Sequence, residues 1–171
     1  DELKIFSLNE KCKLKLSITA LSRYSLYING IEIGHGPAQG CAEQYYCDIL
    51  DVDEYLKIGV NTIAVKVVSF PPITALSDNV MGPYNTIGTD AGPCLFVMGE
   101  CINEKNKPVI NISTGLCDWY VANDKAVSWH MESDVRIGAF ESVCGEKIPY
   151  EWNISEEIGD EFNLAIRRWS M

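Results

Sequence analysis

The sequence predicts an all-β protein built as a β-sandwich or jelly roll. Apolar and polar residues alternate with a period of two along much of the chain. About eight short apolar or β-branched runs are separated by turn residues, and hardly any stretch has a helical period. The 171 residues are 47% hydrophobic, which is enough apolar material for the core of one domain.

A long amphipathic strand and a hairpin open the predicted fold. Residues 11–18 alternate without a miss, so one face lies in the core and the lysines lie in water. Residues 24–28 and 31–33 form two further strands. Asn29-Gly30 between them predicts a type I′ turn, which needs positive φ at both central residues. The glycine- and proline-rich stretch that follows is expected to end this ladder.

The middle of the chain contains one strong strand between weaker elements. Residues 44–48 are expected to form a short strand, and residues 51–56 a single helical turn with an aspartate at its start. A turn over 57–61 leads into a strand over 62–68, which is rich in β-branched residues. Residues 70–93 contain many Gly and Pro and no clear period, which is typical of a long functional or mobile loop.

Four more strand signals follow this loop or the turn at 103–108. The continuous apolar run at 94–98 predicts a central strand that is covered on both faces. Residues 109–113 are the next expected strand, and the short aromatic runs at 119–122 and 127–129 are the last two.

The pattern weakens after residue 140, where acidic residues accumulate. We expect residues 1–140 to form the sandwich domain. Residues 141–171 are expected to form an acidic segment that packs on this domain or leads to a further, missing domain. Trp152 and Trp169 are the expected anchors of this segment.

The charge of the chain excludes two classes of partner. Asp and Glu outnumber Lys and Arg by 24 to 14, for a formal net charge of -10. Nucleic acids and anionic membranes bind clustered Lys and Arg, so we expect neither as a partner. No apolar run reaches the length of about 18 residues that a membrane-spanning helix needs, and the first four residues do not resemble a signal peptide.

The seven cysteines do not form a metal or redox motif. No pair has C-x-x-C spacing, which argues against zinc-ribbon and thioredoxin-like sites. Cys12, Cys94 and Cys101 lie in apolar strands and are expected to be small buried side chains in a reducing compartment. This interpretation favours a cytoplasmic location. A disulfide between Cys41 and Cys47 is the alternative.

Catalytic motifs are absent from the sequence. It has no nucleophile elbow, no zinc-protease motif and no phosphate-binding loop. His35 is expected on an exposed loop and His130 near a strand end. Asp48, Asp51 and Asp53 lie at a strand end and a turn, where aspartates satisfy backbone donors. We therefore predict no catalytic residue and no metal site in this chain.

Aromatic residues near strand ends and on loops are the remaining candidates for binding. Sugars stack their C–H faces on flat aromatic rings, and nearby polar groups fix their orientation. The candidate carbohydrate-binding residues are Tyr46, Tyr84, Trp119 and Tyr120, with Tyr45 beside the first of them. The alternative is that most of these rings pack in the sandwich core.

Three stretches resemble a known family. The pattern R-Y-x-L-Y-x-N-G-x-x-x-G-x-G-P over residues 23–37 resembles the N-terminal β-sandwich of bacterial α-L-rhamnosidases. Residues 50–65 are similar to the family's D-V-T-x-Y-L-K-x-G-x-N-x-I-A-V stretch, and residues 112–119 to its I-x-T-D-x-x-W strand and turn. Phe140-Glu141 is a weaker match to a later F-x-E segment. The hairpin is shared with the sugar-binding jelly rolls of β-galactosidase-like enzymes.

The resemblance implies a galactose-binding-like jelly-roll β-sandwich. In such glycoside hydrolases this domain precedes a large helical barrel that carries the catalytic acid and base, and 171 residues leave no room for that barrel. We therefore expect a non-catalytic accessory domain, whose partners are the catalytic domain of the parent enzyme and a rhamnose- or galactose-containing glycan. The alternatives are a stand-alone carbohydrate-binding module and an interdomain module of a β-galactosidase-like enzyme.

The resemblance also bears on whether this chain has a calcium site. Some relatives bind rhamnose through a calcium ion held by the segment after the strand that matches residues 63–68. In this chain that segment, residues 69–73, departs from the family's glycine- and tryptophan-rich stretch. We therefore expect no cofactor, with calcium as the alternative.

Overall fold

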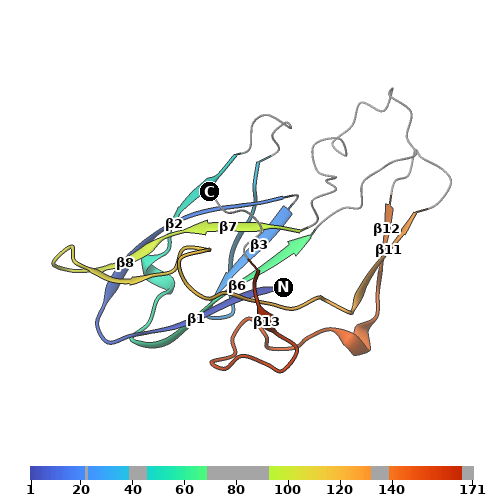
Figure 1. Ribbon diagram of the computed structural model, residues 1–171. Helices are drawn as coiled ribbons and strands as arrows, with labels where there is room; N and C mark the ends of the chain where they lie inside the picture. The colour runs from blue at the N-terminus through green and yellow to red at the C-terminus, as the bar shows by residue number, and fades with distance from the viewer. Residues whose placement is uncertain (22, 39–45, 69–92, 132–138, 167–171) are drawn as a thin grey trace.

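The computed structural model describes residues 1–21, 23–38, 46–68, 93–131 and 139–166 of the protein. In these residues the protein is all-β, with two short 3-10 turns, η1 (Asp53–Tyr55) and η2 (Gly145–Lys147), as its only helical elements (Figure 1). All paired strands among them run antiparallel. The predicted all-β class and sandwich architecture are confirmed.

The first sheet has six strands in the order β13-β10-β1-β6-β3-β4. Its strands are β1 (Glu2–Leu8), β3 (Arg23–Ile28), β4 (Ile31–Gly36), β6 (Gly59–Val68), β10 (Tyr120–Val121) and β13 (Asn163–Leu164). The long central strand β6 pairs with β1 on one side and with β3 on the other.

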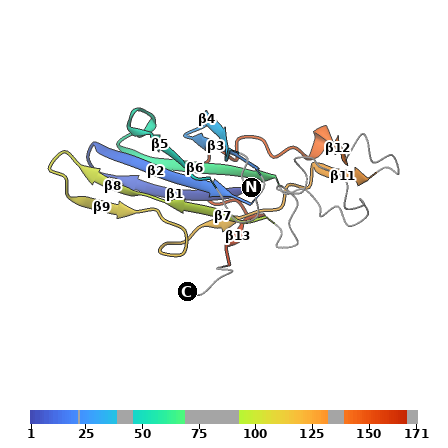
Figure 2. The same ribbon diagram turned by 90° about the horizontal axis from the view of Figure 1, so that it is seen from above.

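The second sheet is centred on β2 (Cys12–Ala20). This strand pairs with β5 (Asp48–Asp51) along one edge. Along its other edge it pairs with β7 (Leu95–Met98) and then with β8 (Glu100–Asn103), and β9 (Pro108–Asn111) follows β8. Figure 2 shows β8 and β7 following one another along the length of the molecule, since they pair with successive parts of β2.

Apolar side chains from the facing sides of the two sheets meet in one core. The first sheet contributes Phe6, Leu8, Tyr24, Leu26, Ile28, Ile63 and Val65, and the second contributes Cys12, Leu14, Leu16, Ile18, Val97 and Cys101. In β2 the apolar positions are buried and the intervening lysines are exposed, as the alternation predicts.

The predicted hairpin is also present. Asn29 and Gly30 have φ of 50° and 83°, so both central residues adopt the positive φ that the turn needs. β4 continues to Gly36, although the glycine-rich sequence was expected to end it earlier. Only glycine fits at this position, because a Cβ on Gly36 would collide with the Asp48 carboxylate and the Tyr24 hydroxyl, which are hydrogen-bonded to each other at 2.5 Å.

Two other local expectations differ from the structure. The strand expected at 44–48 is found at Asp48–Asp51, and residues 44 and 45 lie outside the described residues. The expected helical turn shrinks to η1, where the Asp53 carboxylate accepts the Leu14 N–H of β2 at 2.6 Å. This aspartate therefore ties η1 to the second sheet, and η1 has no side-chain cap.

Strand β7 is not covered on both faces as its apolar run predicts. Val97 is fully buried, but Phe96 and Met98 on either side of it are 51% and 54% exposed. The strand pairs only with β2 among the described strands, and its outer face is open. The continuous apolar run therefore reflects an exposed apolar surface and not a second buried face.

The strands β11 (Val127–Met131) and β12 (Ala139–Val143) form a separate two-stranded hairpin. It lies at one end of the molecule, beyond the strands of the two sheets (Figures 1 and 2). Residues 141–148 are all exposed. Among the described residues there is no helix with the length and apolar character needed to cross a membrane.

Candidate functional site

Residues 148–166, which we call the strap, lie across the outer face of the first sheet. One row of side chains on that face crosses five strands, because Leu164, Tyr120, Leu3, Ala64 and Tyr27 are opposite one another in successive ladders. Side chains in such a row lie on the same face of a sheet. Leu3 and Ala64 are fully buried although they point away from the main core, because the strap covers them.

Several contacts anchor the strap to the sheet. The ring of Trp152 packs edge-on against Tyr27, with the ring centroids 6.1 Å apart. The Thr62 hydroxyl donates to the Ser155 carbonyl at 2.6 Å. Ile154 lies directly over Gly30, where a Cβ would collide with it. The strap is therefore held at the hairpin turn and at the central strand.

Two more contacts hold the outer parts of the strap. The Lys57 ammonium and the Glu156 carboxylate form an exposed ion pair at 3.1 Å. The Ala165 N–H donates to the Trp119 carbonyl at 2.8 Å, and β13 adds a short strand to the edge of the sheet at β10. These contacts lie on both sides of a hollow that the strap leaves open.

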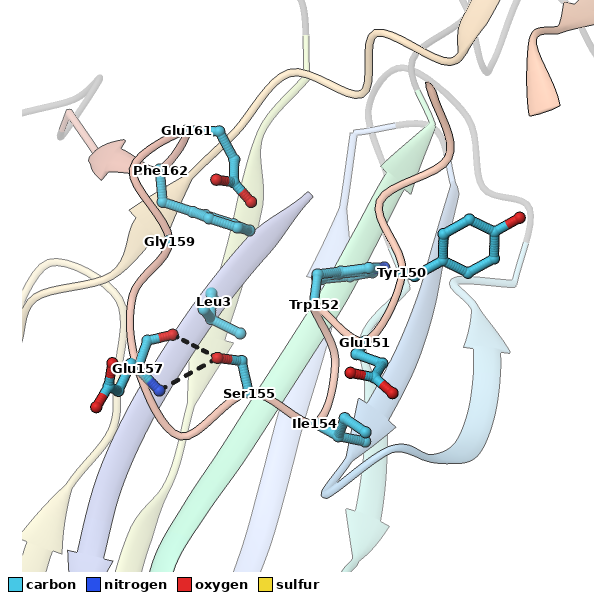
Figure 3. A pocket seen from close by; sticks show the side chains of 10 residues that line it. All are labelled: Leu3, Tyr150, Glu151, Trp152, Ile154, Ser155, Glu157, Gly159, Glu161 and Phe162. Atoms are coloured by element: carbon cyan, nitrogen blue, oxygen red, sulfur yellow. Dashed lines mark hydrogen bonds between the residues drawn. The ribbon is translucent and has the colours of Figure 1, made fainter. Parts of the chain in front are cut away.

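This hollow, which we call the strap pocket, has a volume of about 400 Å³. It is lined by Leu3, Tyr150, Glu151, Trp152, Ile154, Ser155, Glu157, Gly159, Glu161 and Phe162. Figure 3 shows Phe162 and Trp152 on opposite sides of Leu3, and the ring of Tyr150 on the far side of Trp152 from Leu3. The volume falls within the range of small-molecule sites, about 300–1,000 Å³.

The pocket combines an apolar floor with a polar mouth. Leu3 is fully buried, and Phe162 and Trp152 are half-buried. Glu151, Glu157 and Glu161 are all exposed, so their carboxylates lie in contact with water. The Ser155 hydroxyl donates to the Glu157 carbonyl at 2.7 Å, and the Glu157 N–H donates back to it at 3.2 Å, which fixes this side of the loop.

The four aromatic residues predicted to bind carbohydrate do not form one site. Trp119 is only 3% exposed, and its indole N–H donates to the Ile112 carbonyl at 2.9 Å, so its ring packs in the core. Tyr120 is half-buried in β10, opposite Leu3. Tyr46 is 47% exposed and lies by the second sheet, where its carbonyl accepts the Thr19 hydroxyl. Tyr84 lies outside the described residues.

The aromatic residues that do line a pocket, Tyr150, Trp152 and Phe162, come from the acidic tail. The sequence pattern predicts Trp152 as an anchor, but it predicts no binding role for any of these three rings. The available signal was the presence of large aromatic side chains in a stretch without strand periodicity. Such a stretch must bury its rings against another element or leave them at a surface.

A second surface lies on the outer face of the second sheet. Ile49 and Met98 are opposite Ser17 from either side, and Phe96 is opposite Thr19. Ile49 is 62% exposed, and the two β7 side chains are about half exposed. We call Ile49, Phe96 and Met98 the outer patch. Exposed apolar clusters of this kind mark interaction surfaces.

The titratable groups with shifted pKa values serve the fold. Burial raises the pKa of Tyr24, and its hydrogen bond to Asp48 raises it further. Burial also raises the pKa of the Cys101 thiol to about 12, so this cysteine is a buried apolar side chain, as expected. Cys12 is buried too, whereas Cys94 is half-buried.

Other site expectations fall partly outside the described residues. His35 is exposed, with Nδ1 3.9 Å from Glu32. In the described residues, no group of three or more His, Cys, Asp and Glu side chains is placed to hold a metal ion. The segment 69–73, to which the calcium expectation refers, is not among those residues, and neither is Cys41.

Comparison with known proteins finds solved structures of similar fold. No family model and no curated protein matches the sequence. The α-L-rhamnosidase from Dictyoglumus thermophilum matches 96% of this chain with a TM-score of 0.65 and 19% identity. The Streptomyces avermitilis α-L-rhamnosidase, solved in complex with L-rhamnose, matches 95% with a TM-score of 0.65 and 20% identity. The GH78 rhamnosidase of Bacillus sp. GL1 matches 95% with a TM-score of 0.62 and 19% identity.

These matches establish the fold. They cover almost all of this chain but only 15–17% of each rhamnosidase chain. The protein therefore has the fold of one part of these larger chains.

Proposed function

We propose that this chain is a non-catalytic accessory domain of an α-L-rhamnosidase-like glycoside hydrolase, with a galactose-binding-like jelly-roll fold. The observation that carries the proposal is the match over 96% of this chain to 17% of an α-L-rhamnosidase. The motif at residues 23–37 supports it independently, because it resembles the N-terminal sandwich of the same family.

The proposed partner of the chain is the catalytic domain of that enzyme. Two features of the structure favour an interface. The outer patch leaves three large apolar side chains exposed on the second sheet. The β11–β12 hairpin extends from the sandwich without a third strand, and isolated two-stranded hairpins are marginally stable in water. Both features are accounted for if a further domain covers them.

Turnover of an aryl α-L-rhamnoside tests the non-catalytic role. Glycosidases need two carboxyl groups that face each other across the bond to be cleaved, and the strap pocket has three carboxylates among its lining residues, those of Glu151, Glu157 and Glu161. We expect no turnover above a blank by the purified chain. Turnover that is lost in Glu161→Gln, purified in the same way, would overturn the proposal, whereas turnover retained in that variant identifies a contaminant.

The gene around these 171 codons tests the identity of the parent. We expect an adjoining stretch that codes for a large helical barrel. A gene that codes for this sandwich alone would instead support a stand-alone module.

A further inference from the structure

We propose that Asn29-Gly30 is a latent site of non-enzymatic deamidation, which the strap and the buried Asn61 amide keep closed and which opens when the strap lifts. This inference goes beyond the proposed function and does not depend on it. Asn29-Gly30 is the only Asn-Gly dipeptide in the sequence. The turn needs positive φ at both positions, and both residues adopt it. The fold therefore uses a chemically reactive dipeptide for reasons of backbone geometry.

The reaction needs no partner other than water. The backbone nitrogen of Gly30 loses its proton and attacks Cγ of Asn29, and the side-chain nitrogen leaves as ammonia. Water then opens the resulting succinimide ring at one of its two carbonyl groups, which gives either aspartate or isoaspartate. Glycine after asparagine favours the attack, because it has no side chain to crowd the attacking nitrogen. The products are an acid in place of an amide and, for isoaspartate, a longer backbone.

Hydrogen bonds to both polar atoms of the Asn29 side chain oppose this attack. Its Oδ1 accepts the Thr62 N–H at 3.0 Å, and its Nδ2 donates to the Tyr55 carbonyl at 2.8 Å and to Asn61 Oδ1 at 3.0 Å. Asn61 is itself fully buried. The amide carbon becomes tetrahedral as it is attacked, so the planar group that makes these bonds is lost. Reaction in the folded chain therefore requires a local opening of the structure.

The strap covers the glycine of the turn. Ile154 lies directly over Gly30, in the place that a Cβ on this glycine would occupy. Thr62 connects the strap to Asn29, since its hydroxyl donates to the Ser155 carbonyl at 2.6 Å and its own carbonyl accepts the Asn29 N–H at 2.9 Å. An opening of the strap therefore uncovers Gly30 and loosens Thr62, one of the residues that hold Asn29.

Either product would disturb the turn. The Nδ2 group of Asn29 faces two acceptors, the Tyr55 carbonyl and Asn61 Oδ1. An ionised aspartate has no donor to offer them, so it would bring a charged oxygen against two others. Isoaspartate adds one carbon to the backbone of a two-residue turn, whose length fixes the register of the hairpin. Deamidation after strap opening is therefore a one-way step that weakens the β3–β4 hairpin.

Peptide mapping by mass spectrometry tests the proposal on the whole chain. The chain is incubated at pH 8 with and without enough urea to unfold it, and the conversion of Asn29 from amide to acid is followed together with its isoaspartate content. We expect conversion in the folded chain to be at least about tenfold slower than in the unfolded chain. Equal rates in the two states would overturn the proposal, and so would absence of conversion in the unfolded chain.

Two substitutions of the same kind test the role of the strap. Ile154→Ala removes the side chain over Gly30 and is expected to make conversion in the folded chain at least about threefold faster. Ile166→Ala is the matched control, because this strap residue is 91% exposed, and it is expected to leave the rate unchanged. Equal rates in the two variants, both shown to be folded by thermal melts, would refute the protective role of the strap.

Asn29→Asp reproduces one product directly. This variant is expected to lower the melting temperature by about 4 °C or more, because two acceptors lose their donor. Asn106→Asp is the control, since Asn106 is an exposed turn residue that also has positive φ, at 54°. Its melting temperature should change by less than about 2 °C. Equal melting temperatures of the two variants would show that deamidation does not weaken the hairpin and would overturn that part of the proposal.

Discussion

At the scale of single residues, one buried amide joins the turn between β3 and β4 to the segment that leads into β6. The Asn61 side chain is fully buried and accepts from the Lys57 N–H at 2.9 Å and from the Asn29 amide at 3.0 Å. It also donates to the carbonyls of Lys57 and Gly59. Asn29 in turn accepts the Thr62 N–H and donates to the Tyr55 carbonyl. The Asn-Gly turn is therefore fixed by its side chains as well as by its backbone.

Replacement of this amide is expected to be costly. Asn61→Ala leaves buried donors and acceptors without partners, and each costs about 1–3 kcal/mol. We expect the free energy of unfolding to fall by about 2–4 kcal/mol, measured by urea denaturation. Asn163→Ala, at an exposed residue of β13, is the matched control and should change stability by less than about 0.5 kcal/mol. Equal effects of the two variants would contradict the role of the network.

Glu2 makes stability depend on pH. Burial raises the pKa of Glu2 to about 7, and the nearby N-terminal ammonium opposes this shift. An acid whose pKa is higher in the folded state binds its proton more tightly there, so stability falls as pH rises from about 4.5 to about 7. The expected loss is about 1–3 kcal/mol over this range.

Urea denaturation of Glu2→Gln at pH 5 and pH 8 measures this loss. The variant is expected to lose less stability than the unchanged chain between the two pH values. Glu104→Gln, at an exposed turn residue, should keep the original pH dependence. If Glu2→Gln also keeps that dependence, ionisation of Glu2 is not its source.

At the scale of elements, periodicity predicts strands with one exposed face, whereas β6, which is buried on both faces, is predictable only from its β-branched residues. β2 and the β3–β4 hairpin alternate or contain a turn dipeptide, so they were predictable. β1 was not, because Leu3 faces the strap while Phe6 faces the core, which hides the period. The strap pocket was equally hidden, since it depends on a non-periodic tail meeting the first residues of the chain.

Trp152 is expected to anchor the strap, because its ring packs edge-on against Tyr27 of β3. Trp152→Ala removes the ring that packs on Tyr27 and is expected to destabilise the chain by about 2–4 kcal/mol, since the site is half-buried. Hydrogen exchange of residues 148–166 should accelerate. Tyr150→Ala is the matched control, because this neighbouring ring is 79% exposed. Similar exchange in both variants would show that Trp152 does not anchor the strap.

At the scale of the whole molecule, the two sheets differ in how their outer faces are covered. The strap covers the outer face of the first sheet. The outward-pointing side chains of Leu3, Thr62 and Ala64 are therefore buried, as are the side chains on the core face of the same sheet. Nothing among the described residues covers the outer patch of the second sheet in the same way. This asymmetry makes the second sheet the face on which we expect the proposed partner domain to dock.

Removal of the outer patch is therefore expected to reduce the exposed apolar surface of the second sheet without changing the fold. Phe96→Thr combined with Met98→Thr places β-branched residues, which favour strands, in β7 and removes two half-exposed apolar side chains. Fluorescence of a bound hydrophobic dye is expected to fall about twofold or more, and the melting temperature to change by no more than about 4 °C.

Leu116→Thr is the control for that double variant, because Leu116 is more exposed than either patch residue but lies in the turn after β9, outside the patch. Its effect on dye binding should be small, since a single exposed apolar side chain is normal on a protein surface. If the double variant binds dye as the unchanged chain does, the outer patch is not a cohesive apolar surface. A large fall in melting temperature would instead show that Phe96 and Met98 stabilise this domain, and the docking face would have to be sought at the β11–β12 hairpin.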